Sequence, residues 1–437
     1  MAYKTKKKIK QQKHLKLMGR FIFILYTAAA PLLAAGYLFS LIFTPRRGRL
    51  AKLGPELKER LAVELPALPQ KALWFHAASM GEVKAISVLA PLLAKKLDND
   101  FFITTSTATG KKEALKITEN VTLMPVDFYP FVKKLIEQTK PVMLINAETE
   151  IWPAAFHLAD EYGIPVYIAS ARISQGTFSL YKKLSPLTEY IFRGVRKVLC
   201  QSESDAERYR RLKGLEGRVY VTGNLKYDQT SAAEKNTEIT ELMRIFNPHS
   251  APVFTAGCTH PEEEGIILEG YKKALEHIPE LKLVIAPRHL EQISITEKNI
   301  RNAELNYTVW PDSPADETAK ASVLLINRTG VLQSLYSCSA VCFTGGTLDN
   351  TGGHNLLEPA LFSRPVLFGP GYRTAKIAGD ALVKNKGGFI IRTSDDLAKE
   401  LKSLILHTEA LSEAEKNSCR TLKELQGATN RTLDMIP

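Results

Sequence analysis

Short apolar runs alternate with longer helical patterns from Lys71 onward, and this alternation restricts the fold more than any other feature. Runs such as ALWFH (72–76), VMLINA (142–147) and LKLVIAP (281–287) have the length and composition of buried strands. The segments between them, for example 82–97 and 204–214, have the spacing of amphipathic helices. Strands that alternate with helices form parallel sheets covered on both faces, so the sequence predicts an α/β protein.

The alternation occurs in two series, and the polar stretch 228–250 separates them. A chain of 437 residues is also long enough for two domains. We therefore predict two Rossmann-like, doubly wound domains that face a cleft, with ligand-binding loops at the carboxyl ends of the strands. The predicted boundaries are 1–52 for a basic N-terminus with a membrane anchor, 53–228 for the first domain, 229–250 for a linker and 251–437 for the second domain with C-terminal helices.

The net charge of +12 is confined to the N-terminus. Residues 1–52 contain twelve Lys or Arg and no acidic residue, which leaves 46 basic and 46 acidic residues in the rest of the chain. The body of the protein is therefore electrically balanced. This balance argues against a nucleic-acid-binding protein, which would carry its basic residues on the folded domains.

An uncharged run from Phe21 to Thr44 lies inside this basic segment. It is long enough to cross a bilayer as a helix, which takes roughly 20 residues. Arg46 and Arg47 follow directly, which favours an uncleaved anchor over a signal peptide. Pro31 also permits a bent helix that lies in the membrane plane, and a buried helix of a soluble protein is the remaining alternative. Because cations flank both ends, the charge pattern does not choose an orientation.

The five cysteines are scattered and show no CxxC pair and no Cys/His spacing for zinc. We therefore expect reduced thiols in a cytosolic protein. The cysteines are Cys200, Cys258, Cys338, Cys342 and Cys419.

Three motifs of the first series follow strands and contain charged residues. HAASMGEVKA (76–85) places Glu82 in the first turn of a helix, where it serves either as a structural cap or as a general base. NAETEIWPAA (146–155) carries Glu148 and Glu150 before a helix, a common place for capping acids. VTGNLKYD (221–228) carries Lys226, either a solvated surface lysine or a cation that stabilises a phosphate leaving group.

Two further motifs lie in the second series. APRHLE (286–291) offers the Arg288 guanidinium to a phosphate or carboxylate. TGGTLDNTGGHNLLEPA (344–360) sits between a predicted strand and a predicted helix, so its glycines are expected to bring backbone N–H groups to a phosphate. Asn355 and Glu358 should face one ligand, with Glu358 on a ribose diol. The pattern is neither GxGxxG nor a P-loop; Asp349 and the paired glutamates offer ligands for a cation.

These motifs, in this order, resemble those of the 3-deoxy-D-manno-octulosonic acid (Kdo) transferases. HAASMGE resembles the family's H-x-x-S-x-G-E, and ETEIWP resembles its E-T-E-L-W-P. SARIS, GNLKYD, PRH and GGHN-x-L-E follow at matching intervals, and the resemblance covers nearly the whole chain. Each motif alone is weak, whereas the ordered set is specific.

The resemblance implies a metal-independent, inverting GT-B glycosyltransferase without a cofactor. It would transfer Kdo from CMP-Kdo to a lipid A precursor at the cytoplasmic face of the inner membrane, without a nucleic-acid partner. Glu82 would be the catalytic base, Glu148 and Lys226 would stabilise the transition state, and Arg172 in SARIS would contact the acceptor. The positions that match CMP-binding segments are Pro287, Arg288, Thr329, Gly330, Val331, Asn355, Leu356, Leu357 and Glu358.

One position departs from the family pattern. The family often has D-T-x-G-E-L where this chain has NRTGVL (327–332), so Val331 replaces a glutamate and implies a backbone contact. Two alternatives remain open from the sequence. One is another membrane-associated GT-B transferase with a UDP-sugar donor and a lipid acceptor; the other is a membrane-tethered nucleotide-binding protein without catalysis.

Overall fold

The computed structural model describes residues 18–28, 50–228, 236–349 and 351–437. The chain divides into two compact units. The first comprises Met1–Gln229 together with Gln426–Pro437, and the second comprises Thr230–Leu425. The two doubly wound units confirm the predicted α/β fold class. The last segment differs from the sequence prediction, which kept all of 251–437 in the second domain, because residues 426–437 pack with the first unit.

The first unit contains a seven-stranded parallel sheet with the order β3-β2-β1-β4-β5-β6-β7. Side chains of β1 alternate between two cores: Trp74 packs into one, and Leu73 and Phe75 pack into the other. This alternation is the two-residue period of a strand buried on both faces. The strands are β1 (Leu73–His76), β2 (Phe101–Thr105), β3 (Val121–Leu123), β4 (Met143–Ala147), β5 (Val166–Ala171), β6 (Val195–Cys200) and β7 (Val219–Val221).

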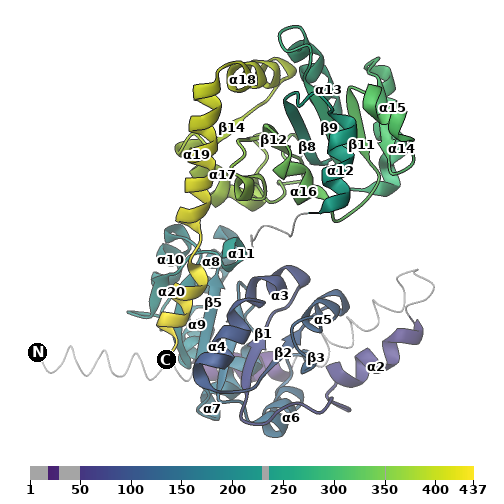
Figure 1. Cartoon of the computed structure of the whole chain (residues 1–437). Coiled ribbons are helices and arrows are strands. Elements are labelled where there is room, and N and C mark those ends of the chain that lie inside the picture. The colour runs from purple at the N-terminus through teal and green to yellow at the C-terminus, as the bar shows by residue number, and fades with distance from the viewer. Residues whose placement is uncertain (1–17, 29–49, 229–235, 350) are drawn as a thin grey trace, which may run out of the picture. The chain divides into compact units, whose positions relative to one another are not determined.

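Helices flank this sheet on both faces (Figure 1). The sequence predicts one helix over 82–97, but the structure has two helices there. Ser87 is the C-cap of the first and Val88 is the N-cap of the second, which has Pro91 in its first turn. The helices are 18–28, α2 (Leu50–Arg60), α3 (Met80–Ile86), α4 (Leu89–Leu97), α5 (Ala108–Ala114), α6 (Tyr129–Thr139), α7 (Pro153–Glu161), α8 (Gln175–Lys183), α9 (Ser185–Phe192), α10 (Glu203–Arg210), α11 (Leu225–Asp228) and α20 (Ala428–Met435).

The second unit repeats this plan with the strand order β10-β11-β9-β8-β12-β13-β14, again all parallel. Along β9, Leu283 and Ile285 pack into one core while Val284 and Ala286 pack into the other. The strands are β8 (Val253–Thr259), β9 (Lys282–Pro287), β10 (Tyr307–Trp310), β11 (Val323–Ile326), β12 (Val341–Thr344), β13 (Val366–Phe368) and β14 (Gly388–Ile390).

Helices of the second unit include one inside the predicted linker. That helix, α12, packs Ile239, Leu242 and Phe246 into the core, so part of the predicted linker contributes structure to this unit; residues 229–235 of that linker lie outside the described residues. The α-helices are α12 (Thr237–Phe246), α13 (Pro261–Leu275), α14 (Ile293–Asn302), α15 (Ala315–Lys320), α16 (Leu332–Ser337), α17 (Lys376–Lys384), α18 (Ser394–Leu406) and α19 (Thr408–Leu425). Three short 3-10 helices are η1 (Leu290–Gln292), η2 (Pro359–Phe362) and η3 (Arg373–Ala375).

The start of the predicted membrane anchor is a helix that packs on the first unit. Phe23 is buried against His157, with ring centroids 4.4 Å apart. Gly19 lies so close to α9 that a Cβ atom would be 2.3 Å from the carbonyl oxygen of Pro186. The remainder of the predicted anchor, 29–44, lies outside the described residues. Within the described part of the chain, no helix has both the length and the apolar character that a membrane crossing requires.

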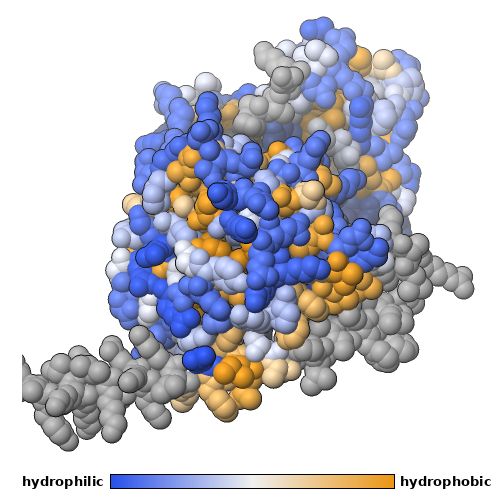
Figure 2. Space-filling view, turned by 90° about the horizontal axis from the view of Figure 1, so that it is seen from below, coloured by the Kyte–Doolittle hydropathy of each residue, from blue (hydrophilic) through white to orange (hydrophobic). Residues whose placement is uncertain are grey.

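The opposite side of the helix 18–28 exposes apolar side chains. Phe21, Ile24 and Leu25 each have more than half of their surface accessible to solvent. Figure 2 shows hydrophobic residues gathered at the lower edge of the face seen there, among mostly hydrophilic ones. The helix therefore has one apolar side that packs on the first unit and another that is open to its surroundings.

Candidate active site

Glu82 lies in the first turn of α3, where it forms a capping box with Ser79. The backbone N–H of Ser79 donates to Oε2 of Glu82 at 3.1 Å, and the N–H of Glu82 donates to Oγ of Ser79 at 3.4 Å. This reciprocal pair satisfies two backbone donors that the helix cannot satisfy internally. The structural reading of Glu82 is therefore confirmed, and the same contacts fix the direction of its carboxylate.

The environment of Glu82 also suits a proton acceptor. The side chain is buried, and this burial, with the nearby carboxylates of Glu148 and Glu150, raises the pKa of Glu82 to about 7. Hydrogen bonds from the backbone of Ser79 and Ala78 oppose the rise. A general base works best when its pKa lies near the working pH. A carboxyl group with a pKa of about 7 meets this condition, whereas a hydrated glutamate does not.

Glu148 and Lys226 form an ion pair beside Glu82. Glu148 follows β4 in the left-handed region, with φ of 55°, and its side chain is buried. The ammonium group of Lys226, on α11, lies 2.5 Å from Oε1 of Glu148. It also lies 3.9 Å from the position that a Cβ atom would take on Gly81. The structure thus brings together Glu82, Glu148 and Lys226, which come from three separate motifs.

A network of contacts that the sequence did not reveal supports the loop 148–152. The ring of His76 meets that of Trp152 edge-on at 5.2 Å, and burial lowers the pKa of His76 to about 3, so this histidine is neutral. The indole N–H of Trp152 donates to Oε2 of Glu150 at 3.1 Å, and the amide of Asn146 donates to the carbonyl oxygen of Glu150 at 2.7 Å. These contacts hold Glu150 close enough to influence Glu82.

Asp127 holds the helix that follows this loop. Its buried carboxylate accepts hydrogen bonds from the backbone N–H groups of Ala154 and Ala155 at the start of α7. The hydroxyl of Tyr26, in the N-terminal helix, donates to the same carboxylate at 2.8 Å. Burial raises the pKa of Asp127 to about 6 despite these donors. The start of the predicted anchor is therefore linked to the helix next to the Glu148 loop.

Arg172, predicted to contact the acceptor, lies exposed directly after β5. Its backbone carbonyl accepts a hydrogen bond from the hydroxyl of Tyr209, at 3.4 Å. Since β5 adjoins β4 in the sheet, Arg172 lies at the same carboxyl edge as Glu148.

In the second unit, the predicted donor-binding residues also follow neighbouring strands. Arg288 comes directly after β9, and its N–H donates to the carbonyl oxygen of Thr259 at the end of β8. Burial and the Glu358 carboxylate raise the pKa of the Cys258 thiol to about 11, while Arg288 opposes the rise. Arg288, Cys258 and Glu358 therefore lie close together at the carboxyl edge of the sheet.

Asn355 and Glu358, which the sequence predicted to face one ligand, are in contact with each other, and they do not lie at the start of an α-helix. The side-chain amide of Asn355 donates to Oε1 of Glu358 at 3.4 Å, and its carbonyl oxygen accepts from the N–H of Leu357 at 3.2 Å. The predicted helix over LLEPALF is wrong: a turn over 356–358 leads into the short 3-10 helix η2. An α-helix dipole at this point is therefore missing from the site.

The glycine-rich loop also differs from the prediction that its N–H groups are open to a phosphate. The buried carboxylate of Glu263 accepts the N–H groups of Gly346, Thr347 and Leu348 at distances of 2.7, 2.9 and 2.7 Å. Gly345 is needed for close packing, because a Cβ atom there would be 2.2 Å from the carbonyl oxygen of Cys258. The N–H groups at the start of the loop thus bind a carboxylate of the same chain. Only the N–H groups later in the loop remain for a ligand.

The other predicted CMP-binding positions fall into two groups. Thr329 and Gly330 are exposed, and Pro287 is half-buried, so these three can reach a ligand. Val331, Leu356 and Leu357 are buried. Their side chains serve packing, so only their backbone groups are available to a ligand, as the sequence implied for Val331.

Comparisons with known proteins agree with these motifs. Residues 55–229 match the family model described as 3-deoxy-D-manno-octulosonic-acid transferase (kdotransferase). A 3-deoxy-D-manno-octulosonic acid transferase from Haemophilus influenzae is 28% identical over 89% of this chain and 93% of its own length. One from Aquifex aeolicus is 27% identical over 79% of this chain and 89% of its own length. A bifunctional glycosyltransferase/methyltransferase from Fusobacterium nucleatum is 29% identical over 84% of this chain, which spans 58% of that relative.

Solved structures agree on the fold. A glycosyltransferase from Rickettsia africae has a TM-score of 0.55 at 14% identity, covering 84% of this chain and 97% of that one. The UDP-GlcNAc 2-epimerase from Neisseria meningitidis has a TM-score of 0.59 at 16% identity, and the match covers 84% of this chain and 99% of the epimerase. At such identities the likeness concerns the fold alone.

Two doubly wound units, each with charged residues at the carboxyl ends of its strands, give this chain the GT-B fold. The ordered motifs and the matching relatives make the chain similar to the 3-deoxy-D-manno-octulosonic acid transferases.

Proposed function

We propose that this protein transfers Kdo from CMP-Kdo to a lipid A precursor, with inversion at the anomeric carbon and release of CMP. The observation that carries the proposal is the buried Glu82 carboxyl group, whose pKa is raised to about 7 next to the Glu148–Lys226 ion pair. Similarity to the 3-deoxy-D-manno-octulosonic acid transferases supports the sugar, and the donor and acceptor follow from the resemblance of the motifs.

Glu82 is the general base in this mechanism. Its ionised carboxylate removes the proton from the acceptor hydroxyl as the hydroxyl oxygen attacks the anomeric carbon of Kdo. A new C–O bond forms while the bond from the anomeric carbon to the CMP phosphate oxygen breaks. The anomeric carbon gains oxocarbenium character in the transition state, as in other glycosyl transfers. The capping box with Ser79 keeps the carboxylate in one direction and so reduces the cost of aligning it.

Cationic groups stabilise the departing nucleotide. The leaving group is a nucleoside monophosphate, and the guanidinium of Arg288 suits its phosphate because it offers a planar fork of donors. Lys226 supplies a second cation, and its position is fixed by the 2.5 Å ion pair with Glu148. Glu358 accepts the ribose hydroxyl groups, with Asn355 beside it.

The acceptor side of the proposal includes the membrane. We propose that the protein works at the cytoplasmic face of the inner membrane and that Arg172 contacts the phosphorylated acceptor. Two features support the location: the basic N-terminus of the sequence, and the exposed Phe21, Ile24 and Leu25 of the N-terminal helix. Apolar side chains next to cations bind the interface of anionic bilayers.

A transfer assay tests the proposal. The purified full chain is incubated with CMP-Kdo and lipid A precursor in detergent or vesicles, and mass spectrometry counts the sugars gained. We expect product from the wild type, and none from Glu82→Ala, while CMP binding persists in that variant. Turnover by Glu82→Ala would refute the base assignment. Protection of the protein from thermal unfolding by UDP and not by CMP would instead favour a UDP-sugar transferase.

A further inference from the structure

A cluster of metal-ligand side chains lies in the second unit, next to the residues assigned to the donor. His260, Glu262 and Asp349 each offer one ligand atom, and these atoms all lie within 4.8 Å of one another. His260 and Glu262 flank Pro261 at the start of α13, whereas Asp349 lies on the loop after β12. We propose that these three side chains bind a tetrahedral divalent ion of the Zn²⁺ class.

The spacing of the pair His260–Asp349 supports an ion between them. Nδ1 of His260 lies 3.5 Å from Oδ2 of Asp349, which is longer than a normal N–H···O hydrogen bond of about 2.7–3.2 Å. Two ligand atoms at about 2.0–2.2 Å from a tetrahedral Zn²⁺ lie about 3.4 Å apart. The observed separation therefore fits two ligands of one ion better than it fits a direct hydrogen bond.

His354 orients His260 for this role. Nε2 of His260 lies 3.0 Å from Nε2 of His354, and the two rings stack with centroids 5.3 Å apart. When Nε2–H of His260 donates to Nε2 of His354, Nδ1 of His260 is the unprotonated nitrogen, and it lies 3.5 Å from Oδ2 of Asp349. A metal-binding histidine commonly donates its second ring N–H to such a partner, which fixes both the tautomer and the ring direction.

The Asp349 carboxylate is also held in place. Its Oδ1 accepts the backbone N–H of Thr351 at 2.8 Å, and the hydroxyl of Thr351 donates to Oδ2 at 2.5 Å. The loop before Asp349 is fixed by the bonds from Gly346, Thr347 and Leu348 to Glu263. Because Glu263 belongs to α13 as well, this carboxylate keeps the loop next to His260 and Glu262.

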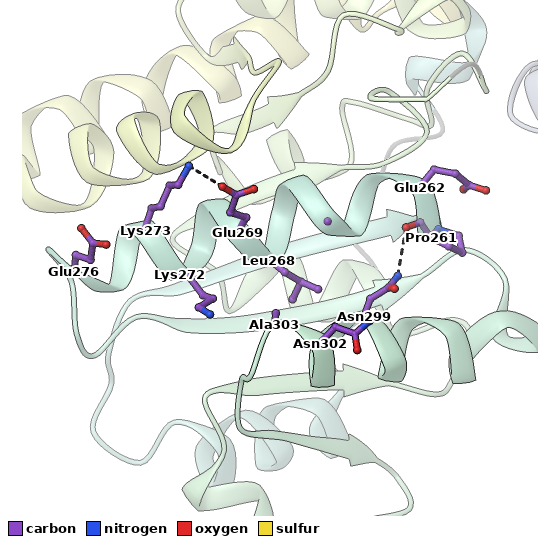
Figure 3. Close-up of a pocket in the computed structure, with 11 residues that line it drawn as sticks. Pro261, Glu262, Leu268, Glu269, Lys272, Lys273, Glu276, Asn299, Asn302 and Ala303 are labelled. Atoms are coloured by element: carbon purple, nitrogen blue, oxygen red, sulfur yellow. Dashed lines mark hydrogen bonds and ion pairs between the residues drawn. The ribbon is translucent and has the colours of Figure 1, made fainter.

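Glu262 supplies the third ligand from the first turn of α13. Figure 3 shows its carboxylate apart from Leu268 and Lys272, which point between α13 and α14. Glu262 is the most exposed of the three ligands, so it can move toward an ion without disturbing the core. One imidazole nitrogen with two carboxylates suits Zn²⁺ or Co²⁺, whereas Mg²⁺ and Ca²⁺ prefer oxygen ligands alone.

The ion is separate from the proposed chemistry. Its ligands join the start of α13 to the loop that continues through His354 to Asn355. Binding would therefore fasten the loop next to the proposed donor residues, whereas Glu82 and Lys226 belong to the first unit and need no ion.

Metal titration of the full chain tests the proposal. Protein freed of metal with a chelator is titrated with Zn²⁺ by calorimetry and with Co²⁺ by visible absorption, which reports tetrahedral coordination. We expect one ion per chain at this site. We also expect Glu262→Gln and Asp349→Asn each to weaken the affinity at least about tenfold, and His354→Gln to weaken it about ten- to hundredfold through its support of His260. Circular dichroism confirms that each variant is folded.

Two control variants identify binding elsewhere. His407→Gln and Glu276→Gln remove exposed residues of the same types from other parts of the second unit, and each should leave the affinity unchanged. Retained affinity in both Glu262→Gln and Asp349→Asn would overturn the site. So would Co²⁺ spectra of octahedral form, or full competition by equimolar Mg²⁺.

Discussion

The pH dependence of sugar transfer provides the sharpest prediction from the structure. With a pKa of about 7, about one Glu82 carboxyl group in ten is ionised at pH 6 and about nine in ten at pH 8. Since only the ionised form accepts a proton, kcat/KM should rise about tenfold between these values and then level off. A normal glutamate would give a flat profile over this range.

Unfolding measurements report the same group without a transfer assay. The folded protein holds the Glu82 proton up to about pH 7, whereas the unfolded chain releases it near 4.5. The stability from this group is therefore fully present below pH 4.5 and is lost as the pH rises through 7. The change amounts to about 3 kcal/mol, since each pKa unit corresponds to about 1.4 kcal/mol. The difference in unfolding free energy between wild type and Glu82→Gln isolates this contribution.

A pair of variants tests the cause of the raised pKa. Burial is the largest cause, and the charges of Glu148 and then Glu150 add to it. Glu150→Gln should therefore move the rising limb of the rate profile to lower pH, because one repelling carboxylate is gone. Glu161→Gln, an exposed change on α7, should leave the limb in place. The reasoning would be refuted if kcat/KM of the wild type rose near pH 4.5, or if it rose at the same pH in the wild type and in Glu150→Gln.

Three further changes have defined outcomes. Tyr26→Phe removes the 2.8 Å hydrogen bond to Asp127. It should lower the free energy of unfolding, measured in urea, by about 1–3 kcal/mol. The control Tyr162→Phe changes an exposed tyrosine and should have little effect. Glu263→Leu leaves three buried N–H groups without their acceptor and should cost at least about 3 kcal/mol by the same measurement; a loss below 1 kcal/mol would contradict the loop assignment. Lys226→Met should lower kcat about a hundredfold with unchanged CMP affinity by calorimetry, and an equal loss of CMP affinity would argue against a transition-state role.

Much of the fold could be predicted because its strands are buried on both faces. Runs such as VMLINA and LKLVIAP are apolar apart from one residue each, and β4 and β9 occupy them. The prediction of an α-helix over 356–362 was wrong for a local reason. Asn355 caps a turn through the N–H of Leu357, and Pro359 then begins a 3-10 helix of four residues. Side-chain caps and prolines compete with helix formation over such short segments.

The candidate site was predictable where a motif follows a strand, since Glu82, Glu148 and Arg288 all lie at carboxyl ends. The supporting groups gave no comparable signal. Glu263 belongs to a run of three acids at the start of α13, a pattern typical of ordinary capping, yet it binds a loop more than eighty residues away. Such long-range partners depend on strand order, and the order of β8 beside β12 cannot be read from the motifs.

The path of the C-terminal segment has a consequence for the synthesis of the protein. Ala428 and Ile436 complete a core of the first unit, and Lys96 donates hydrogen bonds to the carbonyl oxygens of Leu433 and Ile436. Domains commonly fold in the order in which they leave the ribosome. Here the first unit stays incomplete until nearly two hundred later residues have been translated, so the inserted unit can mature before its host does.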